Sequence, residues 1–199
     1  MKNIIDSYFH ELRDALEEVQ CTGPEEVALT RAKAYEITLQ IAQDAAKRGN
    51  KVMFIGNGGS AGIASHMAID FSKNGRMPAL CFTDGAALTC LGNDYGYEEV
   101  FAQQLRYHAR PGDVLFAISS SGSSPNILRA VAVAREAGCH VITMTGFRPD
   151  NPLRAMGDVN FHVGASEYGI VEVAHAALIH GVVNLKLACA AATSLRDAD

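Results

Sequence analysis

Two nucleotide-binding signatures are absent from this sequence. No segment has the GxGxxG spacing of a dinucleotide-binding turn, and no glycine-rich loop ends in GK[ST] as a P-loop does. A CxxC pair is also missing, which argues against a cysteine-based metal or redox centre. The scatter of the five cysteines is typical of buried, reduced thiols in a cytoplasmic protein. They are Cys21, Cys81, Cys90, Cys139 and Cys189.

Long hydrophobic runs and basic clusters are scarce as well. The longest apolar stretch, 171–183, contains Glu172, His175 and His180, so it is too short and too polar to predict a membrane span. No N-terminal segment pairs a basic start with an apolar run, so no secretory signal is expected. The net charge of −5, with no basic cluster to offset it, argues against a nucleic-acid partner.

What is present predicts a globular α/β domain. Helices are expected at 3–20 and 25–48, as a hairpin that packs against other subunits. Apolar strands are then expected at 51–55, 79–83, 113–118, 140–145 and 159–163, with helices between them at about 60–72, 85–92, 97–108, 124–137 and 150–156. A final helix, about 168–190, is apolar nearly all round. The pattern predicts a three-layer sandwich around a five-stranded parallel sheet in one domain, 1–190, followed by a loose tail, 191–199. Residues 1–49 are expected to serve oligomerisation.

A glycine-rich turn follows the first expected strand. Asn57, Gly58, Gly59 and Ser60 lie between an apolar run and a helix. Glycines allow a close approach of the backbone, and the first N–H groups of a helix point at whatever lies there. The turn therefore predicts an anion site.

A second polar turn follows the third expected strand. Its hydroxyls and N–H groups can bind phosphate without a lysine. A plain loop with Ser124 as helix cap is the alternative interpretation. The turn consists of Ser119, Ser120, Ser121, Gly122, Ser123 and Ser124. Between the two turns, 92–98 is expected to be a polar loop whose Asp94 could position sugar hydroxyls.

Four side chains on two expected helices could carry chemistry. His66 and Asp70 are four residues apart, and Glu172 and His180 are eight apart, so each pair shares a helix face. Two imidazoles and two carboxylates suit a divalent metal, zinc or a neighbour in the series. His175 could share the face of Glu172. Simple helix-surface pairs, His66 with Asp70 and Glu172 with His175, are the alternative interpretation.

These segments together resemble the phosphoheptose isomerases, a branch of the sugar isomerase (SIS) domain family. The matching segments are GNGGSAGIASH at 56–66, GNDYGYEEVFAQQL at 92–105, PGDVLFAISSSGSSPNI at 111–127 and the pair Glu172 and His180. They occur in collinear order over roughly residues 1–190.

The resemblance implies conversion of sedoheptulose 7-phosphate to glycero-manno-heptose 7-phosphate through an enediol, an early step toward cell-envelope heptose. It also implies a homotetramer, with a nearby zinc ion. Phosphate would be held by Ser119, Ser120, Ser121 and Ser124. The sugar would contact Asn57, Ser60 and Asp94. Asp70 is expected to act as base and His180 as partner acid.

The chain departs from the family pattern at four positions. Asp70 stands where the family usually has Glu, and Glu172 where it usually has Gln. Asn74 replaces a basic residue and Gly169 an aspartate. Two other functions therefore stay open: isomerisation of a different sugar phosphate, and a non-catalytic SIS module that binds partners, such as a replication-initiation regulator.

Overall fold

A computed structural model describes residues 1–196 of the chain. Its helices are α1 (Lys2–Glu17), α2 (Arg31–Lys47), α3 (Gly59–Lys73), α4 (Gly85–Tyr95), α5 (Val100–His108), α6 (Pro125–Glu136) and α7 (Tyr168–Arg196), with 3₁₀ turns η1 (Pro24–Glu26), η2 (Tyr97–Glu99) and η3 (Pro152–Met156). Its strands are β1 (Gln20–Thr22), β2 (Ala28–Leu29), β3 (Val52–Gly56), β4 (Ala79–Cys81), β5 (Val114–Ser119), β6 (His140–Gly146) and β7 (Val159–Val163).

The strands form one sheet in the order β2-β1-β7-β6-β5-β3-β4. All five expected strands are present and pair in parallel, so the predicted α/β fold is confirmed. The sheet also contains two short strands that the sequence pattern did not predict. β1 pairs antiparallel with β7, and β2 pairs antiparallel with β1.

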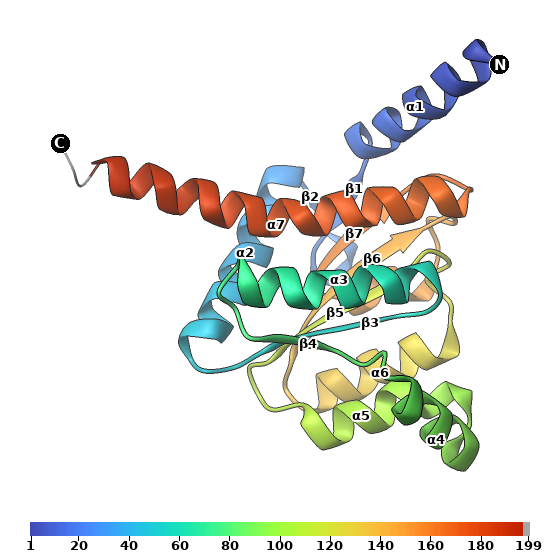
Figure 1. The fold of residues 1–199 in the computed structure, drawn as a ribbon, viewed down its shortest axis with the longest axis vertical. Helices are drawn as coiled ribbons and strands as arrows, with labels where there is room; N and C mark the ends of the chain where they lie inside the picture. Colours follow the sequence, from blue (N-terminus) through green and yellow to red (C-terminus); the bar gives the residue numbers. More distant parts are fainter. Residues whose placement is uncertain (197–199) are drawn as a thin grey trace.

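Both faces of the sheet are covered, as the uniformly apolar strands require. Successive side chains of a strand point to opposite faces. Phe54 of β3 and Phe116 of β5 enter one core cluster with α2, α3 and α7, whereas Met53 and Leu115 enter a second cluster with α5 and α6. Figure 1 shows the resulting layers, with α3 and α7 on one side of the strands and α4, α5 and α6 on the other.

The N-terminal region differs from the expected helical hairpin. β1, η1 and β2 separate α1 from α2, and the helix predicted to start at residue 25 begins at Arg31. Pro24 at the start of η1 and the pairing of Cys21 with Phe161 of β7 explain the change, because sheet pairing takes these residues out of helical geometry. α1 contacts α7 and projects away from the rest of the molecule (Figure 1).

α7 extends past the expected end at residue 190 and reaches Arg196, so the first part of the predicted loose tail is helical. The last three residues of that tail lie outside the described part of the chain. By length and composition alone, Tyr168–Ala192 also meets the criteria for a membrane span, with a mean hydropathy of 1.4. Val171, Ala174 and Leu178 of this helix pack in the sheet core, which is the other common setting for an apolar helix.

Candidate functional site

Both polar turns lie at the carboxyl ends of neighbouring strands. β3 leads through α3 to β4 on one side of the sheet, and β5 leads through α6 to β6 on the other. Ligands of open α/β sheets bind at such a point of reversal, outside the carboxyl ends of the strands. Gly56 at the end of β3 is in register with Ile118 of β5, so the two turns face the same crevice.

The glycine turn has the backbone geometry that the sequence predicted. Gly58 caps α3 with a φ of 54°, a left-handed conformation that side chains with a Cβ rarely adopt. A Cβ on Gly59 would overlap the carboxylate of Glu172 from α7. The glycines therefore allow α7 to place an acidic group against the first turn of α3.

The second polar turn, residues 119–124, is called the serine turn below. It lines a cavity of about 100 Å³, the serine cavity. That volume equals a few water molecules, at about 30 Å³ each, and suits one phosphate-sized group. Ser120 is 4% exposed, and its Oγ has no hydrogen-bond partner. Ser124 precedes α6 but makes no capping bond with its side chain, so the helix-cap interpretation leaves its hydroxyl unexplained. The lining residues are Asn57, Ser60, Ile118, Ser119, Ser120, Ser121, Ser124, Tyr168 and Glu172.

Asn57 connects the two turns. Its amide pairs with that of Asn126 in the first turn of α6 through two hydrogen bonds of 2.9 Å each. The phenol of Tyr97 donates a third bond, of 3.1 Å, to Asn57 Oδ1.

Asp94 lies in α4, where the sequence predicted a polar loop. The segment Gly92–Tyr95 continues that helix, which ends only at Gly96 with its φ of 88°. Asp94 Oδ1 accepts a bond from Asn93, and the residue does not line the serine cavity. Its contact with a sugar stays a prediction.

The predicted catalytic pair is assembled between α3 and α7. His180 Nδ1 lies 3.3 Å from Asp70 Oδ2, and the rings of His66 and His180 meet edge to face at 5.1 Å. Asp70 Oδ1 accepts a bond from Asn74. The side chain of Asp70 is 12% exposed and that of His180 is 38% exposed, so the imidazole is the accessible member of the pair.

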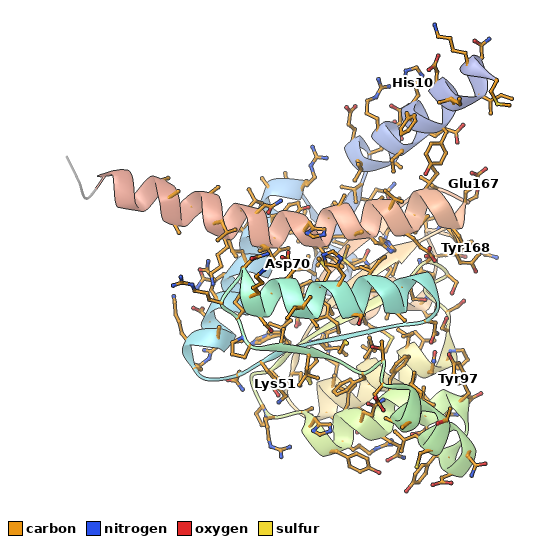
Figure 2. The ribbon with its side chains drawn as sticks, in the orientation of Figure 1. His10, Lys51, Asp70, Tyr97, Glu167 and Tyr168 are labelled. Carbon is orange, nitrogen blue, oxygen red and sulfur yellow. The ribbon has the colours of Figure 1, made fainter. Side chains whose placement is uncertain are left out.

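A second cavity, of about 290 Å³, borders His180 of this pair. It is lined by Gly59, Gly62, Ile63, His66, Met67, Ala176 and His180. We call this second space the histidine cavity. Gly59 lines it and contacts Glu172, which lines the serine cavity, so the two cavities adjoin at the Gly59–Glu172 contact. Figure 2 shows Tyr168 and Tyr97 toward the end where α3 begins, with Asp70 further along that helix.

The four predicted metal donors do not form one cluster in a single protomer. His66, Asp70 and His180 lie together, but Glu172 lies against Gly59 beside the serine turn. Within residues 1–196, no three His, Cys, Asp or Glu side chains are arranged to hold a metal ion. The donor types fit zinc, but their arrangement in the protomer does not.

His175 is a core residue, which settles its role within the protomer. It is 0% exposed, and its Nε2 lies 2.9 Å from the carbonyl oxygen of Thr145. A carbonyl only accepts, so Nε2 carries the proton. Burial lowers the pKa of His175 to about 4, and burial together with the charge of Arg154 lowers that of His162 to about 4. The sequence-based alternative that pairs His175 with Glu172 is therefore wrong, because His175 contacts β6.

Three residues of this site carry no obvious sequence signal: Tyr97, Asn126 and Tyr168. Asn126 follows Pro125 in the predicted α6, and Tyr168 is the first residue of α7. Tyr97 lies within a matching segment, but its spacing from Asn57 gives no hint of contact. Only the crossing of distant elements brings Tyr168 to the wall of the first cavity, and Tyr97 and Asn126 to Asn57.

Comparisons with known proteins agree with this fold. The family model of the SIS domain matches residues 7–146, so the chain belongs to the SIS domain family. Within that family it belongs to the phosphoheptose isomerases. The phosphoheptose isomerase of Nitratidesulfovibrio vulgaris is 41% identical over 154 residues, which cover 74% of this chain and 73% of the relative. That of Campylobacter concisus is 36% identical over 86% of this chain and 92% of its own length.

Solved structures show the same likeness. Phosphoheptose isomerase from Neisseria gonorrhoeae superposes with a TM-score of 0.80 and 32% identity, over 93% of this chain and 98% of that one. The enzyme from Francisella tularensis gives 0.79 and 27%, over 94% and 97%.

Proposed function

We propose that this chain is an aldose–ketose isomerase that converts sedoheptulose 7-phosphate to D-glycero-D-manno-heptose 7-phosphate. The supporting observation is a two-part site, in which a hydroxyl-rich cavity adjoins a cavity lined by His180, whose imidazole contacts the carboxylate of Asp70. The relatives named above, which are phosphoheptose isomerases, support the same reaction.

The dimensions of the site suit an open-chain sugar of this length. Glu172 and His180 are eight residues apart on α7, or about 12 Å at 1.5 Å per residue. Eight bonds separate C1 of a heptose 7-phosphate from its phosphorus, which gives roughly 10 Å at about 1.2 Å per extended bond. A ligand with its phosphate at the serine turn would therefore bring its carbonyl end toward His180.

At the phosphate end, the hydroxyls of Ser119, Ser120, Ser121 and Ser124 are the proposed ligands. The N-terminus of α6 adds the positive end of its helix dipole. Ser120 Oγ, buried and without a partner, gains a bond when an anion enters, which removes the cost of an unsatisfied polar group.

At the carbonyl end, a proton is removed from the carbon beside the carbonyl, an enediol forms, and a proton is returned to the neighbouring carbon. Both oxygens of Asp70 are engaged, by His180 and by Asn74. The geometry therefore favours His180 as the group that moves the proton and Asp70 as the partner that orients its ring. The assignment of Asp70 as base stays a prediction that kinetics can test.

Sedoheptulose 7-phosphate turned over in deuterium oxide provides the test of the function. An enediol mechanism exchanges the moving proton with solvent, so NMR should show deuterium at C2 of the aldose. Absence of turnover would contradict the proposal. A higher kcat/KM for a hexose or pentose phosphate would contradict the proposed substrate but support the same class of reaction.

We also propose a divalent ion, zinc first, bound by His66, Asp70, Glu172 and His180, which would have to move to enclose it. Such an ion would supply a Lewis acid for the enediolate oxygens. Metal analysis of the purified chain and of a His66→Ala variant tests this. Full activity in wild-type protein that holds no metal would contradict it.

We further propose that the chain is a homotetramer in the cytoplasm, with residues 1–49 in its interfaces and no nucleic acid or membrane as partner. Support comes from α1, which has no buried residue and exposes Ile4, Ile5 and Phe9 by 72%, 50% and 61%. An apolar surface on a projecting helix is typical of a protein–protein contact.

A further inference from the structure

We propose that Tyr97 and Asn126 are positioning residues for the isomerase. Acting through Asn57, they would hold the glycine turn at a fixed distance from the serine turn and so set the width of the anion cavity. The inference rests on the proposed function, but it concerns two residues that do not line that cavity.

Asn57 and Asn126 form an amide pair. Asn57 and Asn126 exchange two hydrogen bonds of 2.9 Å across 69 positions of sequence. Asn126 is 2% exposed and sits directly after the serine turn. Because Asn57 belongs to the turn after β3 and Asn126 to the helix after β5, the pair joins the two turns that would enclose the anion.

The phenol of Tyr97 adds a further contact to Asn57. Its bond to Asn57 Oδ1 gives that oxygen two donors, which fills its acceptor capacity. The amide is thereby fixed in one orientation. One N–H of Asn57 Nδ2 then has no partner among the described residues and can donate to a ligand in the cavity that Asn57 lines.

Ion pairs of the neighbouring residues hold Tyr97 in place independently of this bond. η2 is attached to α6 by ion pairs of Arg129 with Glu98 at 2.5 Å and with Glu99 at 2.7 Å. Arg106 of α5 adds a pair with Glu99 at 2.8 Å. Removing the hydroxyl of Tyr97 should therefore leave the backbone where it is and affect only Asn57.

The test compares Tyr97→Phe with Tyr107→Phe. Tyr107 is a matched control, because it is a similarly exposed tyrosine (52% against 63%) that does not contact Asn57. Loss of one hydrogen bond predicts an about three- to tenfold rise in KM for sedoheptulose 7-phosphate in Tyr97→Phe, with kcat within about twofold of wild type. Melting temperatures of both variants should stay close to wild type.

A second variant tests the chain of contacts. Asn126→Asp keeps the shape of the side chain but replaces its donor with an acceptor, so it should also raise KM. Combined with Tyr97→Phe, it should raise KM by less than the product of the two single effects, since both act through Asn57. Equal KM values in Tyr97→Phe and wild type, or independent effects in the double variant, would overturn the proposal.

Inorganic phosphate separates this proposal from the function itself. The shift of melting temperature with phosphate concentration reports binding without any turnover. A chain that binds phosphate less well after Tyr97→Phe but isomerises no sugar would support the positioning role and contradict the isomerase. Unchanged phosphate binding in Tyr97→Phe, with activity intact, would contradict the positioning role and support the isomerase.

Discussion

At the scale of single residues, the clearest feature is the Asp70–His180 contact at 3.3 Å, since the two side chains come from helices far apart in the sequence. A half-buried carboxylate behind a more accessible imidazole is an arrangement that fixes the ring and one of its nitrogens. The geometry thus places the two residues unequally, since His180 is the accessible member and Asp70 is engaged at both oxygens.

Substitutions at the pair should show this inequality. His180→Ala removes the group that moves the proton, so kcat should fall by about 10²–10⁴-fold. Asp70→Asn keeps the shape and removes only the charge, so it should lose less. Steady-state kinetics measure both, with His108→Ala as control, because His108 stacks on Phe82 outside the site. An Asp70→Asn variant as inactive as His180→Ala would instead assign Asp70 as the base.

The contact of Gly59 with Glu172 supports a second prediction at this scale. Glu172 places a carboxylate on the wall of a cavity proposed to hold phosphate, and like charges repel. Glu172→Gln should therefore bind inorganic phosphate more tightly, by a few-fold, or about 1 kcal/mol at low salt. The change in Kd can be followed by calorimetry.

Gly59→Ala provides the matched variant. Its Cβ would meet the end of the flexible Glu172 side chain, which can rotate away at small cost to stability. The carboxylate would then leave the cavity, so Gly59→Ala should also tighten phosphate binding. The double variant, Gly59→Ala with Glu172→Gln, should bind phosphate no more tightly than Glu172→Gln alone. Weaker phosphate binding in Glu172→Gln would show that Glu172 assists the anion instead.

At the scale of elements, α7 is attached to β6 through a buried polar network as well as by apolar packing. His175 bonds to the carbonyl of Thr145, whose hydroxyl lies 3.1 Å from His162 Nδ1 on β7. Asn160 of β7 donates to Thr143 Oγ1 and Thr145 Oγ1. This network holds the helix that carries Glu172 and His180 against the sheet.

The network predicts a loss of stability in mild acid. The pKa of His175 is about 4 in the folded protein, below its ordinary value of 6.5, so between these pH values the unfolded chain binds more protons. Stability is therefore present above pH 6.5 and is lost as the pH falls toward 4, by on the order of 1–3 kcal/mol for this residue.

Urea unfolding at pH 7 and pH 4.5 measures that loss. His175→Gln cannot take up a proton but can still donate to Thr145, so its free energy of unfolding should change less between the two pH values. His10→Gln, on the exposed face of α1, should behave like wild type. Equal acid sensitivity in His175→Gln and wild type would contradict the prediction.

At the scale of the whole molecule, α1 stands apart from the domain it belongs to. It contacts α7, but none of its residues is fully buried, and Ile4, Ile5 and Phe9 face solvent in the single protomer. Such a helix is expected to be stable only when it packs against a further partner, because packing supplies most helix stability in proteins.

Charged residues on α1 should break the assembly. Ile4→Glu combined with Phe9→Glu places two carboxylates in the proposed interface, so light scattering after gel filtration should show a smaller species than the expected tetramer. Lys2→Glu is the control for charge alone. A tetramer that survives the double substitution would remove α1 from the interface.

Much of the sheet could be predicted from the sequence, because each strand is a short apolar run bounded by glycine or a polar turn. Val52–Gly56 and Val114–Ser119 appear within a residue of their expected ranges. β1 and β2 could not be predicted, since Cys21 and Leu29 become strand residues only by pairing with each other and with β7. Their pattern alone resembles the edges of two helices.

The candidate site likewise combines features that the sequence predicted with features that only the tertiary structure shows. Local chemistry in the sequence determined the glycine turn and the serine turn, because glycine conformations and clustered hydroxyls act through neighbouring residues. Helix periodicity also determined that His66 and Asp70 share a face. Only the tertiary structure decided which distant groups meet. The packing of α3 against α7 joins Asp70 to His180, keeps Glu172 at Gly59, and turns His175 into the core, while the α4–α5 connection brings Tyr97 to Asn57. Such contacts depend on how whole elements cross, and periodicity within one element carries no information about that.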